Sequence, residues 1–257
     1  MIFDLKRKLF LVIVFFLLFN LFACENLNDP GMPKYNFSIF VNIQAGIDKQ
    51  KFYIYHTIPL EEYQYGYLKE FDKYFEPNAV ISLQTDSINY TNFFVESDSQ
   101  NIRYYTSNNF IANAGREYQL KIQIGGELIE GRTVVPNEFE IISPQENQII
   151  SFVNKLDVNY SWTNSKNSNC YFIQVEYPFL YNGIQQNTTF IFDQNIQDTT
   201  FNFISYLEPV DTVYTSVTSF DINYFNHIFN GFESAGVEGA YGYFGSSLFK
   251  RNKFLVR

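Results

Sequence analysis

Apolar and polar side chains alternate with a period of two along much of this chain, and this pattern limits its possible folds more than any other feature. The alternation runs through residues 37–43, 118–124 and 156–162. Alternate side chains of a β-strand point to opposite faces, so each segment predicts a strand with one buried face. No long amphipathic helix pattern occurs after residue 23. The sequence therefore predicts an all-β fold with two antiparallel β-sandwich domains.

Turn residues separate the predicted strands and divide the chain. Gly125-Gly126 lies between two strand patterns and supplies the positive φ angles that a two-residue hairpin needs. Because Pro136 ends the second strand, we place a boundary there, with domains at residues 36–136 and 137–257. Residues 224–229 predict a short helix. Further strands are predicted at Phe52–Thr57, Ala79–Leu83, Asn92–Glu96, Arg103–Tyr105, Phe139–Ile142, Tyr171–Tyr177, Thr189–Phe192, Thr200–Phe203 and Val213–Phe220.

The N-terminus has the pattern of an export signal. Three basic residues, Lys6 to Lys8, precede an unbroken apolar run from Leu9 to Phe19. This run is too short for a transmembrane helix, which needs about 20 residues, and it suits a signal peptide. Residues 1–23 are therefore a predicted signal peptide. Residues 24–35 are mostly polar and contain two prolines, which predicts a flexible tether.

The segment that ends this signal, Leu21-Phe22-Ala23-Cys24, resembles the lipobox of bacterial lipoproteins. The resemblance implies cleavage before Cys24 and attachment of membrane lipid to its thiol. Two or three acyl chains anchor a protein stably, because each buried CH₂ contributes about 0.8 kcal/mol. The alternative is an uncleaved N-terminal helix that stays in the membrane with Cys24 buried at its end.

Charge and cysteine content narrow the possible functions. The net charge is −9, of which residues 1–23 contribute +2, so the rest carries −11. This balance argues against nucleic-acid binding, which needs a basic stripe. We interpret the basic run Lys250-Arg251-Asn252-Lys253 as a solvated loop between the last two strands. Lipidation of Cys24 leaves Cys170 alone, and we expect Cys170 to be a buried free thiol.

The histidines and serines do not form a recognisable reactive centre. His56 and His227 have no partner at the spacing of zinc ligands, so we predict no metal and no cofactor. Gly245-Ser246-Ser247 lacks the flanking residues of a hydrolase nucleophile elbow. A structural or surface role is the favoured interpretation of each histidine.

The acidic pairs and a run of glycines also have structural interpretations. Glu61-Glu62, and Glu70 with Asp72, are interpreted as solvated charges, although paired carboxylates are also what a glycosidase requires. Glycines recur every third residue from Gly236 to Gly245 without the spacing of a dinucleotide site. We expect them at a bend or a close backbone approach, with a partner-docking loop as the alternative.

A tyrosine-rich segment provides the main candidate binding surface. Tyr63, Tyr65 and Tyr67 are two residues apart, so in an extended chain their rings would project on one side. Tyrosine rings suit a glycan, a peptide or a protein partner. The alternative is that they pack over the end of a sandwich.

Two resemblances extend this interpretation. Ser143-Pro144, the strand ending in Ser161-Trp162-Thr163, and residues 171–175 are similar to the opening strands of fibronectin type III and immunoglobulin-like domains. The lipobox, the opening strand and several later motifs together resemble a family of Bacteroidota lipoproteins of unknown function found beside TonB-dependent receptors. Those later motifs are residues 74–83, 115–120, 131–133, 135–136 and 242–245.

The second resemblance implies an outer-membrane address and an accessory role in nutrient capture, and it implies no catalytic residues. We therefore expect a non-enzymatic, lipid-anchored binding or accessory subunit of an outer-membrane receptor or transport complex. The alternatives are a glycan-active enzyme that uses dispersed carboxylates and a structural protein of the cell envelope.

Overall fold

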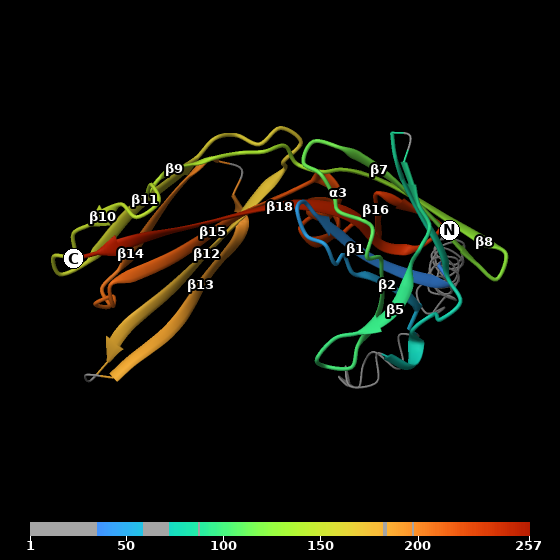
Figure 1. Cartoon of the computed structure of the whole chain (residues 1–257), viewed down its shortest axis with the longest axis horizontal. Helices are drawn as coiled ribbons and strands as arrows, with labels where there is room; N and C mark the ends of the chain where they lie inside the picture. Colours follow the sequence, from blue (N-terminus) through green and yellow to red (C-terminus); the bar gives the residue numbers. More distant parts are fainter. Residues whose placement is uncertain (1–34, 59–71, 87, 182–183, 197) are drawn as a thin grey trace, which may run out of the picture. The chain divides into compact units, whose positions relative to one another are not determined.

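The computed structural model describes residues 35–58, 72–86, 88–181, 184–196 and 198–257, with the backbone alone for residues 193–196 (Figure 1). Nearly all regular structure in these residues is β-strand, which confirms the predicted fold class. The helix α3 spans Ile222–Ile228, close to the predicted position. No helix in the described part of the chain has the length and hydrophobicity needed to cross a bilayer.

The first sandwich has two layers, and residues 37–134 supply four strands to each. One layer has the order β1 (Phe37–Gln44), β2 (Phe52–His56), β6 (Arg103–Thr106), β5 (Phe94–Ser97). The other has the order β4 (Ile88–Tyr90), β3 (Val80–Thr85), β7 (Glu117–Ile124), β8 (Glu127–Val134). When β1 to β8 are lettered A, B, C, C′, D, E, F and G in chain order, these orders correspond to the ABED and C′CFG layers of the immunoglobulin fold.

The second sandwich follows the same plan with a smaller first layer. That layer has the order β9 (Ile141–Ser143), β11 (Leu156–Trp162), β14 (Thr200–Ser205). The facing layer has the order β13 (Ile184–Ile196), β12 (Cys170–Tyr181), β15 (Thr212–Phe220), β18 (Tyr241–Val256), and β10 (Ile149–Ile150) also pairs with β18. This arrangement is the ABE and C′CFG order of an immunoglobulin-like sandwich.

The strand β18 belongs to both sandwiches (Figure 1). It pairs in parallel with β1 from Tyr241 to Ser247 and in antiparallel with β15 from Ser247 to Leu255. Before it, β16 (Ser234–Ala235) pairs with β18, and β17 (Val237–Glu238) extends the layer that ends in β8. The boundary expected at Pro136 lies between β8 and β9, and residues 234–247 then return to the first sandwich.

The interpretation of Lys250–Lys253 as a loop is wrong, because these residues lie inside β18. Their charged side chains reach solvent and find acidic partners there. Lys250 Nζ lies 2.5 Å from Glu138 Oε2, and Arg251 Nη2 lies 2.7 Å from Glu176 Oε2. A strand accommodates such a run when its charged side chains stay at the surface in this way.

Each sandwich encloses its own hydrophobic core, and aromatic side chains fill much of both. Alternate residues of β7 are buried, and the turn after it has φ angles of 55° at Gly125 and 99° at Gly126, as the hairpin prediction requires. The largest fully buried aromatic side chains of the first core are Phe52, Tyr55, Phe110, Tyr118 and Phe244, and those of the second are Tyr160, Trp162, Tyr171, Tyr177 and Phe254.

Candidate functional site

The residues that the sequence singles out most strongly, Cys24 and the row Tyr63, Tyr65 and Tyr67, lie outside the described residues. Their roles therefore stay predictions. The described histidines do not come together. His56 Nε2 lies 2.8 Å from Oε2 of the buried Glu76, and His227 Nδ1 lies 2.7 Å from the carbonyl oxygen of Phe232. Within the described ranges no three His, Cys, Asp or Glu side chains are grouped to hold a metal ion.

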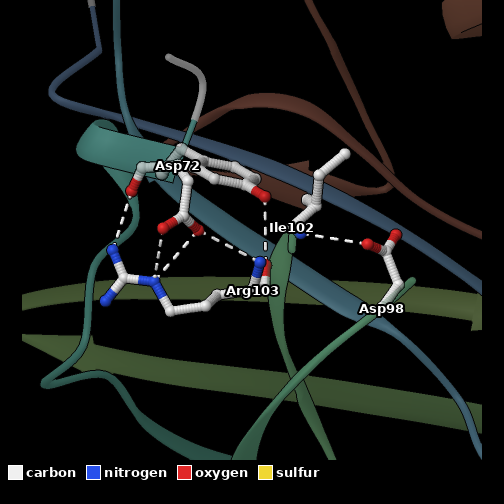
Figure 2. A network of polar contacts seen from close by, with 5 residues as sticks. Asp72, Asp98, Ile102 and Arg103 are labelled. Atoms are coloured by element: carbon white, nitrogen blue, oxygen red, sulfur yellow. Dashed lines mark hydrogen bonds and ion pairs between the residues drawn. The ribbon is translucent and has the colours of Figure 1, made fainter. Parts of the chain in front are cut away.

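Asp72, one member of the acidic pairs noted in the sequence, is held by an arginine (Figure 2). Arg103 Nε donates to both carboxylate oxygens, at 2.9 and 2.8 Å, and Arg103 Nη2 donates to the Asp72 carbonyl oxygen at 2.8 Å. These hydrogen bonds lower the pKa of the Asp72 carboxyl. A glycosidase acid needs a raised pKa, so Asp72 serves to attach its segment to β6.

Ser246 and Asp221 form a buried polar cluster where α3 and β18 meet β8. Asp221 accepts hydrogen bonds from Thr133 Oγ1 at 2.5 Å and from the Tyr224 backbone nitrogen at 3.0 Å. Ser246 Oγ donates to the Val134 carbonyl oxygen at 3.0 Å. Burial raises the pKa of the Asp221 carboxyl to about 6, but the residue is only 2% exposed and cannot reach a substrate. The cluster therefore joins segments of the chain.

Cys170 begins β12 and is a buried free thiol, as predicted. Burial, reinforced by the charge of Asp221, raises the pKa of Cys170 to about 12. A thiol with such a pKa stays protonated at neutral pH and is a poor nucleophile. The residue acts as a small apolar side chain beside Phe220 and Phe225.

A row of aromatic side chains crosses the outer face of the first sandwich. Tyr243, Phe40, Tyr53 and Tyr104 are neighbours on four adjacent strands, β18, β1, β2 and β6. The rings contact one another, with Phe40 and Tyr243 at 6.1 Å and Tyr53 and Tyr104 at 6.0 Å between centroids. His227 from α3 lies 5.2 Å from Tyr243. These rings stabilise the layer by packing on each other, as cross-strand aromatic pairs do.

The second sandwich has a groove on the outer face of its larger layer. We name it the β12–β15 groove; its cavity volume is about 630 Å³, within the usual range of ligand sites. Strands β12, β13 and β15 and the residues just before β15 supply its walls. The side chains on this face with amide, hydroxyl or carboxylate groups are Gln174, Glu176, Gln185, Asn187, Thr189, Asp211, Thr212 and Tyr214.

Strand register explains how the groove is assembled. Thr189, Glu176 and Tyr214 are direct neighbours on β13, β12 and β15, so their side chains share one face. The Arg251 guanidinium stacks on the Tyr214 ring at 4.8 Å and binds Glu176 Oε2 at 2.7 Å. This contact holds the Tyr214 ring, whose neighbours on the two flanking strands are the charged residues Glu176 and Lys253. Tyr214 remains 38% exposed.

The chemistry of this lining suits a neutral, polar ligand. Amides and hydroxyls both donate and accept hydrogen bonds, as the hydroxyl groups of a sugar do. Tyr214 adds a flat apolar surface with a hydroxyl edge. The sequence contains a signal for this face, since Gln174, Glu176 and Pro178 alternate with the buried Ile173, Val175 and Tyr177. Sequence alone does not show that three strands bring these side chains together.

Comparisons with known proteins do not assign this chain to a family. No family model matches the chain, and no characterised protein is a significant match by sequence. Solved structures that align with it include titin-A168169 (10% identity, 87% of this chain and 97% of that chain, TM-score 0.22), the FN1–FN3 domains of chicken CNTN1 (12%, 86% and 64%, 0.25), and fibronectin(III)-like modules of Clostridium thermocellum CbhA (11%, 86% and 94%, 0.22). TM-scores this low do not establish a structural relationship. The fold follows from the pairing of the strands.

Proposed function

We propose that this protein is a lipid-anchored, non-enzymatic binding protein that captures a neutral glycan in the β12–β15 groove and acts as an accessory subunit of an outer-membrane receptor. The observation that carries the binding role is the groove itself, with its hydrogen-bonding lining and its exposed Tyr214. The lipid anchor and the receptor rest on the sequence, through the lipobox-like segment ending in Cys24 and the resemblance to receptor-associated lipoproteins.

The carboxylates near the groove favour binding over hydrolysis. Glu176 forms an ion pair with Arg251, which supports a positioning role for this carboxylate. A glycosidase would need a second carboxyl group with a raised pKa on the other side of the scissile bond. Asp221 has a raised pKa, but it does not line the groove. It is buried beside Thr133, in the cluster that joins α3 to β8.

Binding of a panel of neutral oligosaccharides to the purified full-length protein tests the groove. Tyr214→Ser removes the exposed ring, and we expect affinity to fall by about tenfold or more, which corresponds to at least 1.4 kcal/mol. Tyr206→Ser is the matched control, because Tyr206 is 77% exposed and does not line the groove. Binding that both variants retain, or oligosaccharide cleavage by the wild type, would contradict the proposal.

Mass spectrometry and membrane fractionation test the anchor. We expect the wild-type N-terminus at Cys24 to carry acyl mass, and Cys24→Ser to remain unprocessed or leave the membrane fraction. Recovery of a receptor with the wild type in mild detergent, but not after Cys24→Ser, would support the accessory role. Equal membrane retention of both proteins would contradict the anchor, and absence of any glycan or receptor would favour a structural envelope protein.

A further inference from the structure

The strand β13 leaves one long edge of the second sandwich without a partner among the described residues. It has 13 residues, whereas the other strands at sheet edges have two to six. From Ile184 to Phe192 it contains no charged residue, no proline and no glycine. Natural proteins usually protect an edge with charges, prolines or short strands, because an open edge pairs with other chains. Over residues 184–192 this edge lacks each of those protections.

Half-exposed aromatic side chains lie along the same side of the sandwich. Phe190 and Phe192 of β13 face Phe201 and Phe203 of β14, which is the edge strand of the opposite layer. The ring centroids of Phe192 and Phe201 are 4.5 Å apart, and those of Phe190 and Phe203 are 5.3 Å apart. Only Phe203 is fully buried. A strand added to β13 would cover the rest of this apolar cluster and satisfy the open backbone groups.

We infer that the occupant of this edge is β13 of a second copy, paired in antiparallel about a twofold axis at Thr188. In that register Thr188 lies opposite Thr188 of the second copy, and residue 184 of each copy lies opposite residue 192 of the other. Opposite residues of an antiparallel pair share one face. Ile184, which is 65% exposed, therefore packs beside Phe192 of the partner copy, where the apolar cluster is open.

The chemistry of the edge favours this occupant. Each chain carries −11 after residue 23, so two copies repel overall, but the paired segments carry no charge and can approach. Ile184 of one copy lies opposite Phe192 of the other, which brings two apolar side chains together. The two Thr188 residues bring two hydroxyl groups together, which is a favourable cross-strand combination. The segment between Cys24 and Lys34 of the same chain cannot substitute, because it is polar and contains Pro30 and Pro33.

Disulfide trapping in membranes from cells that express the full-length chain tests the pairing. Two Thr188→Cys residues facing each other have Cα atoms about 4.5–5.5 Å apart, within the range of a disulfide. Mild oxidation should convert most of this variant into a dimer of twice the mass of the monomer in the same membranes. Thr91→Cys, an exposed threonine of the first sandwich, is the matched control and should remain monomeric.

A second pair of variants measures the pairing without a cross-link. Thr188→Lys places two ammonium groups opposite each other, and sedimentation in mild detergent should show a dimer affinity weakened by about tenfold or more. Thr91→Lys should sediment like the wild type. Equal cross-linking of the two cysteine variants, capture of a different protein by Thr188→Cys, or a wild type that sediments as a monomer would each overturn the inference.

Discussion

At the scale of single residues, Asp221 has the strongest influence on how stability depends on pH. Its carboxyl group lies between Thr133 of β8 and the first turn of α3, and it is almost entirely buried. Burial penalises the charged form and raises the pKa from 3.8 to about 6. The folded protein therefore holds this proton more tightly than the unfolded chain does. The resulting stabilisation is complete below about pH 4 and is lost as the pH rises through 6.

We expect Asp221→Asn to remove this dependence. The asparagine amide is neutral at every pH and still caps α3. Relative to the wild type, the free energy of unfolding of the variant should rise by about 3 kcal/mol between pH 4 and pH 7. Urea denaturation at several pH values measures the difference. Asp157→Asn is the control, because Asp157 is exposed and its lowered pKa gives a dependence of opposite sign. A constant difference would show that Asp221 is not the group responsible.

Sequence reasoning identifies single residues well when their neighbours in the chain determine their environment. Cys170 is an example, because the apolar run that it begins predicts burial correctly. Asp221 is a counterexample. Its partner Thr133 is 88 residues away in the sequence, so nothing near Asp221 indicates that its carboxylate is buried. The β12–β15 groove was missed for the same reason.

At the scale of elements, Gly242 determines whether β18 can lie beside β1. Its φ angle is +109°, and a Cβ atom there would lie 2.1 Å from the carbonyl oxygen of Ile39. No side chain fits without moving the backbone of one strand. The prediction that the glycines between 236 and 245 permit a close backbone approach is confirmed at this position.

Gly242→Ala should therefore destabilise the protein by about 3 kcal/mol or more, since it combines an unfavourable φ angle with a backbone clash. Gly231→Ala is the matched control. Gly231 also has a positive φ angle, +68°, but has nothing within 4 Å of the added Cβ, so the cost should be about 1–2 kcal/mol. Chemical denaturation of both variants gives the comparison. Equal losses would mean that the contact with Ile39 has no energetic weight.

The length of β18 exceeds what the sequence predicts for this region. Its first part contains Gly242 and Gly245, and its second part contains the basic run from Lys250 to Lys253, and both features usually mark a loop. The strand continues because Gly242 lets it approach β1 and because Lys250 and Arg251 pair with acidic residues at the surface. Local patterns predict strand positions here, but they do not predict that two strand segments are continuous.

At the scale of the whole described chain, the two hydrophobic cores share one strand. Phe244, in the first half of β18, is fully buried in the first core, and Phe254, in the second half, is fully buried in the second. The sequence predicts two sandwiches correctly. It does not predict their connection, which depends on residues 234–247 pairing with strands that lie far earlier in the chain.

We expect the two cores to unfold together because of this shared strand. Trp162 is the only tryptophan of the chain and belongs to the second core, so its fluorescence reports that core. Phe244→Ala removes a side chain from the first core at a cost of about 3–5 kcal/mol. The Trp162 transition should nevertheless shift to lower denaturant concentration, as it should for Phe254→Ala. An unchanged Trp162 transition in Phe244→Ala would show that the cores unfold independently.

The pairing of β1 with β18 also determines when the first sandwich can finish folding. Its opening strand, which ends at Gln44, pairs early with β2 but obtains its second neighbour only after residues 241–247 have been synthesised. Contacts between such distant segments form slowly, because a long loop must close first. Until then one edge of the opening strand stays open to proteases and to other chains. A ribosome that stops before residue 241 therefore releases a chain with an incomplete first sandwich, which cellular proteases can recognise.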